Sequence, residues 1–102
     1  MNVTLIQRIQ LKNFDTWLNP DTDGLAQMMK SQGVLAYSLF RGTDNPNEVL
    51  VELQFADRKT LNAYQVWYDA MAVEWLKTFP GSEQKIVENW VGENVPSHSR
   101  TL

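Results

Sequence analysis

The sequence has 102 residues and contains no cysteine, a single histidine and no long apolar run. Without cysteine the protein has no disulfide, no thiolate nucleophile and no sulfur ligand for a metal. No apolar stretch approaches the roughly 20 residues that a membrane-spanning helix needs, so we expect no membrane insertion. The first residues, MNVTLIQRIQ, lack the apolar segment of a secretory signal, and we therefore expect a cytoplasmic protein.

Positive charge is also sparse in this chain. Nine Lys and Arg residues are scattered among 12 Asp and Glu, which gives a formal net charge of −3. A nucleic-acid partner is not expected, because binding to a phosphate backbone requires clustered cations. The single histidine, His98, has no Cys, His or Asp at metal-ligand spacing, and we predict no metal site. The sequence has neither a glycine-rich phosphate loop nor a nucleophile elbow, so we expect no cofactor.

Hydrophobic residues make up 43% of the chain and recur with the periods of strands and helices. The predicted strands cover residues 3–11, two runs within residues 37–55, and residues 86–91, and the predicted helices precede Gly33 and span residues 57–79. This order is the ferredoxin-like βαββαβ plan, an α+β fold with an antiparallel sheet and helices on one face. We expect residues 1–92 to form this single domain and residues 93–102 to form a polar tail.

Local signals predict where the helices begin and end. A short helix at residues 14–17 is interrupted by Pro20, Gly33 ends the next helix, and Asp57 is the expected N-cap of the long one. Along that long helix apolar residues recur at steps of three and four, with Trp67 on the flank of the stripe. The members of the stripe are Leu61, Tyr64, Tyr68, Met71, Trp75 and Phe79.

The predicted sheet is apolar on both faces. Helices cover only one face in the ferredoxin-like plan, yet Ile6, Phe40 and Leu50 fall on the other. A second copy of the chain, packed face to face, is the simplest way to bury them, which predicts a homodimer. On this second face we also predict that Arg8 and Glu52 are neighbours, because we expect the first and third strands to run parallel side by side.

Several turn and core motifs are spread over roughly residues 3–91. They are Phe14-Asp15-x-Trp17, Gly33-Val34, Tyr37, Arg41-Gly42, Asn45 to Val51, Phe55 and Asp57. Together they resemble the dimeric α+β barrels typified by the antibiotic biosynthesis monooxygenases. That resemblance implies a barrel built from the sheets of two subunits. Known members include cofactor-independent oxygenases of aromatic polyketides, haem-degrading enzymes and small cyclases or dehydratases.

The resemblance also implies a ligand pocket between the sheet and its helices. In the oxygenase and haem-degrading branches this pocket has an Asn from the first strand and a Trp from the second helix. Trp67 matches that Trp, whereas the first strand has Gln7 where the Asn would be sought. Haem degraders also carry a histidine on the second helix as the iron ligand, and this helix has none, so haem is not expected.

Five residues are therefore candidates for a ligand pocket: Gln7, Tyr37, Tyr64, Trp67 and Tyr68. Aromatic rings offer a planar apolar ligand a large contact area, and tyrosine and tryptophan each add one polar group. The alternative is that the aromatic stripe only packs the core. A buried Gln7 amide likewise needs hydrogen-bond partners, which a ligand or a neighbouring tyrosine would supply.

These observations predict a small-molecule-binding dimeric α+β barrel protein. The activity that the resemblance implies is cofactor-independent monooxygenation of an aromatic or apolar metabolite, in which the deprotonated substrate itself reacts with oxygen. The alternative is a non-catalytic module that binds a ligand or a protein partner. The sequence identifies neither a substrate nor a catalytic residue, so it leaves open whether the chain is an enzyme.

Overall fold

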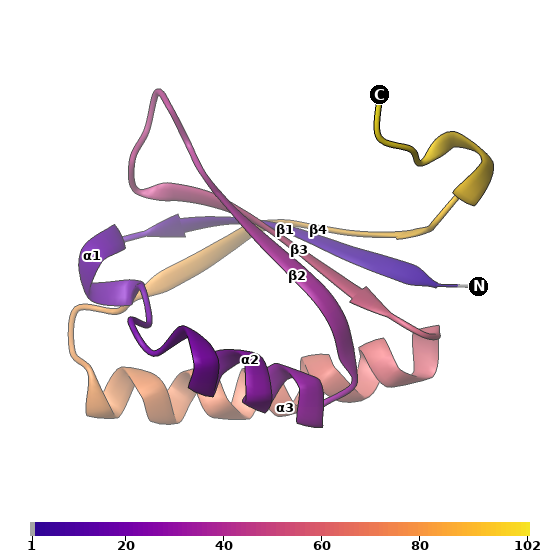
Figure 1. Cartoon of the computed structure of the whole chain (residues 1–102). Coiled ribbons are helices and arrows are strands. Elements are labelled where there is room, and N and C mark those ends of the chain that lie inside the picture. Colours follow the sequence, from indigo (N-terminus) through magenta and orange to yellow (C-terminus); the bar gives the residue numbers. More distant parts are fainter. Residues whose placement is uncertain (1) are drawn as a thin grey trace.

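The computed structural model describes residues 2–102, which build a four-stranded antiparallel sheet with helices on one face (Figure 1). In chain order the elements are β1 (Val3–Leu11), α1 (Phe14–Trp17), α2 (Thr22–Ser31), β2 (Val34–Arg41), β3 (Glu48–Phe55), α3 (Arg58–Thr78) and β4 (Gln84–Glu93), followed by a 3₁₀ turn, Pro96–His98. The strands lie in the order β2-β3-β1-β4. This is the ferredoxin-like topology, and the predicted fold class is confirmed.

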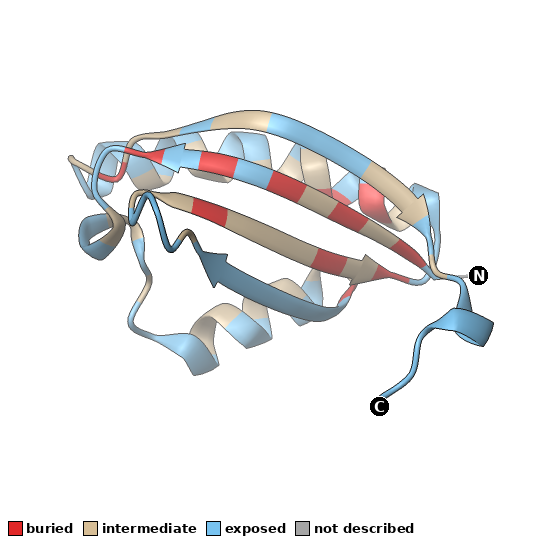
Figure 2. Cartoon of the chain, turned by 90° about the horizontal axis from the view of Figure 1, so that it is seen from above, coloured by how far each residue is buried: buried red, intermediate tan, exposed pale blue. Residues whose placement is uncertain are grey.

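The central strand β1 follows the period of two that its sequence predicts. Its odd-numbered side chains, Val3, Leu5, Gln7, Ile9 and Leu11, are buried on the helix side, and the even-numbered ones lie on the opposite face. Figure 2 shows that buried residues concentrate on β1 and β3, while β2, at the edge of the sheet, is exposed along almost its whole length. The two central strands of the sheet therefore carry most of its buried core residues.

The helix ends are set by the side chains that the sequence indicated. The Asp57 carboxylate accepts a hydrogen bond from the Thr60 backbone amide at 2.8 Å, so Asp57 is the N-cap of α3 as predicted. Asn13 and Asp21 cap α1 and α2 in the same way. Gly33 has a φ of +88° between α2 and β2, a left-handed conformation that glycine adopts at little cost.

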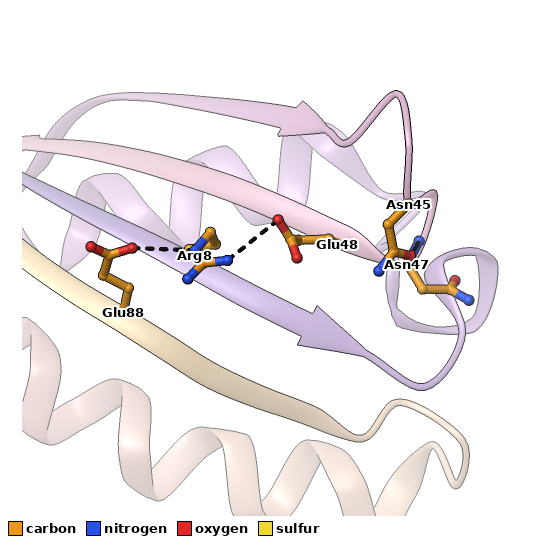
Figure 3. Close-up of polar contacts among 5 residues, drawn as sticks. All are labelled: Arg8, Asn45, Asn47, Glu48 and Glu88. Carbon is orange, nitrogen blue, oxygen red and sulfur yellow. Dashed lines mark hydrogen bonds and ion pairs between the residues drawn. The ribbon is translucent and has the colours of Figure 1, made fainter.

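Two asparagines in the loop between β2 and β3 make hydrogen bonds that order the loop and join it to the start of α1 (Figure 3). The Asn45 side chain accepts a hydrogen bond from the Asn47 backbone amide, and the Asn47 side chain accepts one from the Phe14 amide, both at 3.0 Å. The loop therefore holds the start of α1 in place at one end of the sheet.

The helix side of the sheet is packed in two separate clusters. The larger one lies at the α3 N-terminus and includes Leu5, Leu53, Phe55, Leu61 and Tyr64. The smaller one, Ile9, Leu11 and Val49, lies at the other end of β1 beneath α1. Gln7 stands on β1 between the two clusters. The apolar core is thus divided where the first strand carries an amide.

The prediction that Arg8 and Glu52 are neighbours is wrong. Strand β3 runs antiparallel to both β1 and β2, because the helical crossover returns the chain parallel to β1 and the hairpin then inserts β3 between them. In this register Arg8 faces Leu50, and Glu52 faces Ile6. The Arg8 guanidinium instead lies 3.2 Å from the Glu88 carboxylate and 3.7 Å from that of Glu48 (Figure 3).

Strand β4 is longer than the predicted strand at residues 86–91. It reaches Glu93, and Asn94 continues the contact with the N-terminal strand, since its backbone amide donates to the Asn2 carbonyl and its side chain accepts from the Thr4 hydroxyl. Past this point the chain leaves the body of the molecule (Figure 1). No helix in residues 2–102 combines the length and the apolarity needed to cross a membrane.

We predict that Leu61→Ala lowers the free energy of unfolding by about 3 kcal/mol, because Leu61 is fully buried in the larger cluster and its loss leaves a cavity there. Val66 lies on the same helix but is 74% exposed, so Val66→Ala is the matched control and should change stability by less than about 0.5 kcal/mol. Urea denaturation followed by circular dichroism measures both. Equal effects of the two substitutions would contradict the proposed packing.

We also predict that Asp57 makes stability depend on acid pH. The backbone hydrogen bond from Thr60, and next the one from its hydroxyl, hold the pKa of Asp57 below its ordinary value. A lowered folded-state pKa means that this stabilisation is present above the ordinary pKa and is lost as the pH falls through the lowered one. Asp57→Asn keeps a capping oxygen that does not titrate. Its melting temperature should therefore fall less than that of the wild type between pH 5 and pH 3, and a parallel fall would refute the role of Asp57.

Candidate functional site

A cavity of about 550 Å³ lies between the sheet and the helices. Its floor is formed by the inward side chains of the sheet, Gln7, Ile9, Leu39, Val51 and Ile86. Its walls come from α2, with Leu25, Met28 and Met29, and from the second half of α3, with Tyr68, Met71, Ala72 and Trp75. The cavity occupies the gap between the two packed clusters, where the helices are not held directly against the strands.

Most of this lining is apolar and adaptable. Met28, Met29 and Met71 all contribute to it. Unbranched thioether side chains change rotamer easily and fit irregular apolar surfaces. Exposed apolar side chains, among them Leu18 and Leu76, border the opening. The site therefore has the character of a pocket for a largely apolar molecule.

Four of the five predicted pocket residues line this cavity: Gln7, Tyr37, Tyr64 and Tyr68. Trp67 does not. Successive residues are 100° apart around a helix, so Tyr68 and Ala72 lie on the flank of α3 next to the cavity while Trp67 lies on the opposite flank. There its ring packs against Tyr64, with 5.7 Å between the ring centroids, and against the larger core cluster. The expectation that Trp67 faces the ligand pocket is corrected accordingly.

The stripe along α3 also has two roles instead of one. Leu61 and Tyr64 are buried in the core, whereas Met71 and Trp75 line the cavity. Phe79, the last member of the predicted stripe, is the C-cap residue and is 45% exposed, with its ring against that of Trp75. Helical spacing identified the inward face correctly but could not show that the helix diverges from the sheet.

Two residues that sequence reasoning missed form a polar cluster at one end of the cavity. The Trp17 indole donates a hydrogen bond to Gln84 Oε1 at 2.8 Å, and the Gln84 amide also bonds the Tyr68 hydroxyl, with 2.9 Å from Nε2 and 3.1 Å from Oε1. Trp17 belongs to a motif quoted above, but only for its structural role. Gln84 begins β4, and no sequence pattern marks it.

The Gln7 amide has a partner from the neighbouring strand. Its Nε2 donates to Asn89 Oδ1 at 3.0 Å, and Asn89 faces Gln7 across the β1–β4 ladder. The Gln7 carbonyl oxygen and the Tyr64 hydroxyl make no hydrogen bond with any of residues 2–102. In that part of the chain the only sealed side-chain polar atom without a partner is Glu83 Oε2. The unpaired atoms of Gln7 and Tyr64 therefore have access to open space.

The two phenols beside the cavity are uncharged at neutral pH, and burial strengthens this preference. It raises the pKa of Tyr64 strongly, and the neighbouring Tyr68 adds a smaller effect. It also raises the pKa of Tyr68, although the hydrogen bond with Gln84 opposes the shift. Both side chains are therefore hydrogen-bond donors at neutral pH.

The cavity offers little charge. Among its lining residues Glu83 is the only acidic side chain, and no Lys, Arg or His is present. Glu83 Oε1 lies 3.9 Å from Lys12 Nζ. Residues 2–102 contain no group of three or more His, Asp or Glu side chains able to hold a metal ion. Contacts with a ligand here are thus hydrophobic, aromatic or through neutral hydrogen bonds.

No family model matches the sequence, and no curated protein matches it either. Solved structures share its fold. HapK from Hahella chejuensis has 18% identity and a TM-score of 0.65, over 97% of this chain and 98% of its own. A mutant of SnoaB, a cofactor-independent oxygenase from Streptomyces nogalater, has 13% identity and a TM-score of 0.51, over 91% and 92%. Rv0793 from Mycobacterium tuberculosis has 16% identity and a TM-score of 0.50, over 97% and 100%.

At these identities the likeness is one of fold. It covers nearly the whole length of each chain, so the shared unit is the complete βαββαβ domain and not a fragment of it. The fold that the resemblance implies is thereby confirmed.

The position of the four tryptophans gives a direct test of the cavity. Trp17 and Trp75 line it, whereas Trp67 packs in the core and Trp90 lies on the opposite face of the sheet. We predict that a planar aromatic ligand quenches tryptophan fluorescence and that Trp17→Phe and Trp75→Phe each remove part of the quenching. Trp67→Phe and Trp90→Phe are the matched controls and should leave the quenched component intact. Loss of quenching in a control variant alone would place the ligand elsewhere.

Proposed function

We propose that this protein binds a small, largely apolar and aromatic molecule in the cavity between its sheet and its helices. The observation that carries the proposal is the cavity itself, whose apolar walls converge on a few neutral polar groups, Gln7, Tyr37, Tyr64 and Tyr68. A pocket of this size and character is typical of small-molecule sites. A module that only binds a protein partner would have no need of such an opening in its core.

We further propose that the bound molecule is a substrate for cofactor-independent monooxygenation. Support comes from the fold shared with SnoaB, a cofactor-independent oxygenase. In such chemistry a substrate with an acidic C–H bond loses a proton and its carbanion reacts with dioxygen. A CH₂ group then becomes C=O with one oxygen atom, and the other leaves as water. The protein's part is to orient the substrate, exclude bulk water and donate hydrogen bonds to developing negative charge.

Anthrone is a suitable probe, since it is tricyclic, apolar and has such a CH₂ group. We predict that the protein accelerates dioxygen uptake and anthraquinone formation from anthrone without any added cofactor. Ala72→Trp should abolish this rate and the binding of anthrone, because the indole fills the cavity that Ala72 lines. Ala70→Trp, on the exposed side of the same helix, is the matched control and should retain both. Binding without turnover would favour the non-catalytic alternative.

The homodimer predicted from the sequence is part of the same proposal. On the sheet face opposite the helices, Phe40 pairs with Leu50 and Trp90 pairs with Ile6, and Phe40 and Trp90 are 51% and 58% exposed. A monomer would leave this apolar patch in water. Arg8, with Glu48 and Glu88, lies among these residues and would become buried with its charge already compensated (Figure 3).

We therefore predict a dimeric mass by light scattering at micromolar concentration. Phe40→Asp and Trp90→Asp should each give a monomer, because Arg8 on the contact face is already paired with Glu48 and Glu88, which leaves the new carboxylate without a partner. Val66→Asp, at a position of α3 that is 74% exposed, is the control and should remain dimeric. A monomeric wild-type protein would refute the barrel assembly while leaving the ligand cavity, which lies on the other face, as a separate question.

The proposed place of action is the cytoplasm. An oxidising compartment would add no disulfide stabilisation to this chain, since it contains no cysteine.

A further inference from the structure

The segment that follows β4 projects from the molecule on the side opposite the helices. Asn94 is still attached to the N-terminal strand, since its amide donates to the Asn2 carbonyl and its side chain accepts from the Thr4 hydroxyl. Residues 95–102, which we call the C-terminal arm, then rise from the sheet away from α2 and α3 (Figure 1). Seen from above, the arm lies beyond the end of the strands and does not fold back over its own sheet (Figure 2).

The C-terminal arm is shaped by contacts within itself. The His98 backbone amide and the Ser99 hydroxyl both donate to the Val95 carbonyl oxygen at 3.0 Å, which closes the 3₁₀ turn. Within residues 2–102 no hydrogen bond joins the arm to the rest of the chain, and all of its residues are exposed, Val95 and Leu102 included. A segment that is already partly ordered loses less conformational entropy when it docks on another molecule.

The sheet face opposite the helices, where the homodimer contact is proposed, carries more negative than positive charge. Cross-strand partners share a face of a sheet, so the register places three carboxylates and two cations there: Glu48, Glu52, Glu88, Arg8 and Lys85. The Arg8 guanidinium lies 3.7 Å from the Glu48 carboxylate and 3.2 Å from that of Glu88. These three side chains already form one cluster, which leaves Glu52 to be considered by itself.

Glu52 has no cation beside it in its own chain. Its neighbours across the ladders are Ile6 on β1 and Ser38 on β2, and it makes no ion pair with any of residues 2–102. A second copy packed on this face would remove the carboxylate from water. Burying a charge without a partner is costly, so the proposed dimer needs a cation within reach of Glu52.

Arg100 is the cation best placed to supply this charge. It is the only Lys, Arg, Asp or Glu in residues 94–102, it is exposed, and no ion pair engages it in the described part of the chain. Lys85 is fixed on β4 opposite Gln10, whereas Glu52 lies opposite Ile6, four residues away along β1. Arg100 is instead carried by an arm that points into the layer of the second copy (Figure 1).

The dimensions of the arm are sufficient for this contact. Glu52 lies three residues, about 10 Å, from the strand end at which the arm leaves, and sheets packed face to face are about 10 Å apart, a diagonal of about 14 Å. From Val95 to Arg100, three residues in a 3₁₀ turn and three extended ones span up to about 16 Å. A two-fold axis along the strands places β4 of one copy over β2 of the other, next to β3, which carries Glu52.

We propose that the C-terminal arm docks on a second copy of the chain, where Arg100 forms an ion pair with Glu52 of the partner subunit. This inference rests on the proposed function, because it requires the homodimer that is part of it. It adds a contact that the two packed sheets do not make by themselves. Two-fold symmetry forms the contact twice, so both Glu52 carboxylates of the dimer are compensated.

Charge reversal tests whether the pair forms between subunits. Arg100→Glu and Glu52→Arg each bring like charges together at both contacts, so each variant alone should form a dimer with a dissociation constant at least about tenfold higher. In a mixture of the two variants, the heterodimer joins the introduced carboxylate to the introduced guanidinium and keeps one natural pair. With one variant labelled with ¹⁵N, native mass spectrometry should therefore find heterodimers well above the statistical share. An arm that bound its own subunit would give no such excess.

Lys85→Glu is the matched control, because it makes the same change of charge on the same face. Mixed with Glu52→Arg, it should give no more heterodimer than the statistical share, since no unfavourable contact is relieved. An excess in this mixture would show that Lys85 is the partner of Glu52 and would refute the role of Arg100.

The remaining outcomes separate this inference from the homodimer. If the wild type is dimeric by light scattering but neither charge reversal weakens it, or if the two variants mix statistically, the docking of the arm is refuted and the homodimer stands. If the wild type is a monomer, the homodimer fails and this inference fails with it.

Discussion

The divided core is the constraint on which the rest of this structure depends. The first strand is apolar on its helix side except at Gln7, and the buried clusters lie before and after that position. Helix α3 is held against the sheet by Leu61 and Tyr64 near its start, and α1 is held at the other end of β1. Between these two attachments the helices span the sheet without filling the space beneath them. The cavity is thus a consequence of the positions of the two buried clusters, since close-packed interiors leave few voids by chance.

This arrangement also determines the chemistry available in the cavity. The polar atoms that reach it come from side chains rooted in well-ordered elements, with Tyr64 and Tyr68 on α3, Gln7 on β1 and Gln84 on β4. Each is held by packing or by a hydrogen bond from a neighbouring element, and rigid support of this kind favours a fixed ligand orientation. None is charged. Selectivity in such a site would come from shape and from the direction of hydrogen bonds.

The sequence was sufficient to predict the fold because its signals were local. The alternation over Val3–Leu11, the N-cap at Asp57 and the helix end at Gly33 depend only on nearby residues, and the structure agrees at each. The Arg8–Glu52 pairing failed because register and strand direction arise from the topology of the whole sheet. Here β3 lies between β1 and β2 and runs antiparallel to β1, so Glu48 and Glu88 approach Arg8 instead.

Much of the candidate site could be predicted from the residue spacing on α3. Which flank of that helix faces the cavity could not be predicted in the same way. Tyr64 and Tyr68 were identified by spacing alone, whereas Trp67 lies on the wrong flank by a fraction of a turn. Gln84 contributes by hydrogen bonding to Trp17, which is 67 positions away in the sequence, and to Tyr68, which is 16 positions away. Contacts of that separation leave no periodic trace in a sequence.

The three methionines in the wall have a chemical consequence. In a chain without cysteine, methionine thioethers are the side chains most readily oxidised, and Met28, Met29 and Met71 line the cavity. A pocket in which carbanions meet dioxygen would also expose them to any peroxide that escapes the reaction. Each sulfoxide would add a polar, chiral oxygen to an apolar wall and weaken its affinity for the ligand. The useful lifetime of such a catalyst would then be limited by damage to its own lining, which sulfoxide reductases could repair, long before the fold itself was lost.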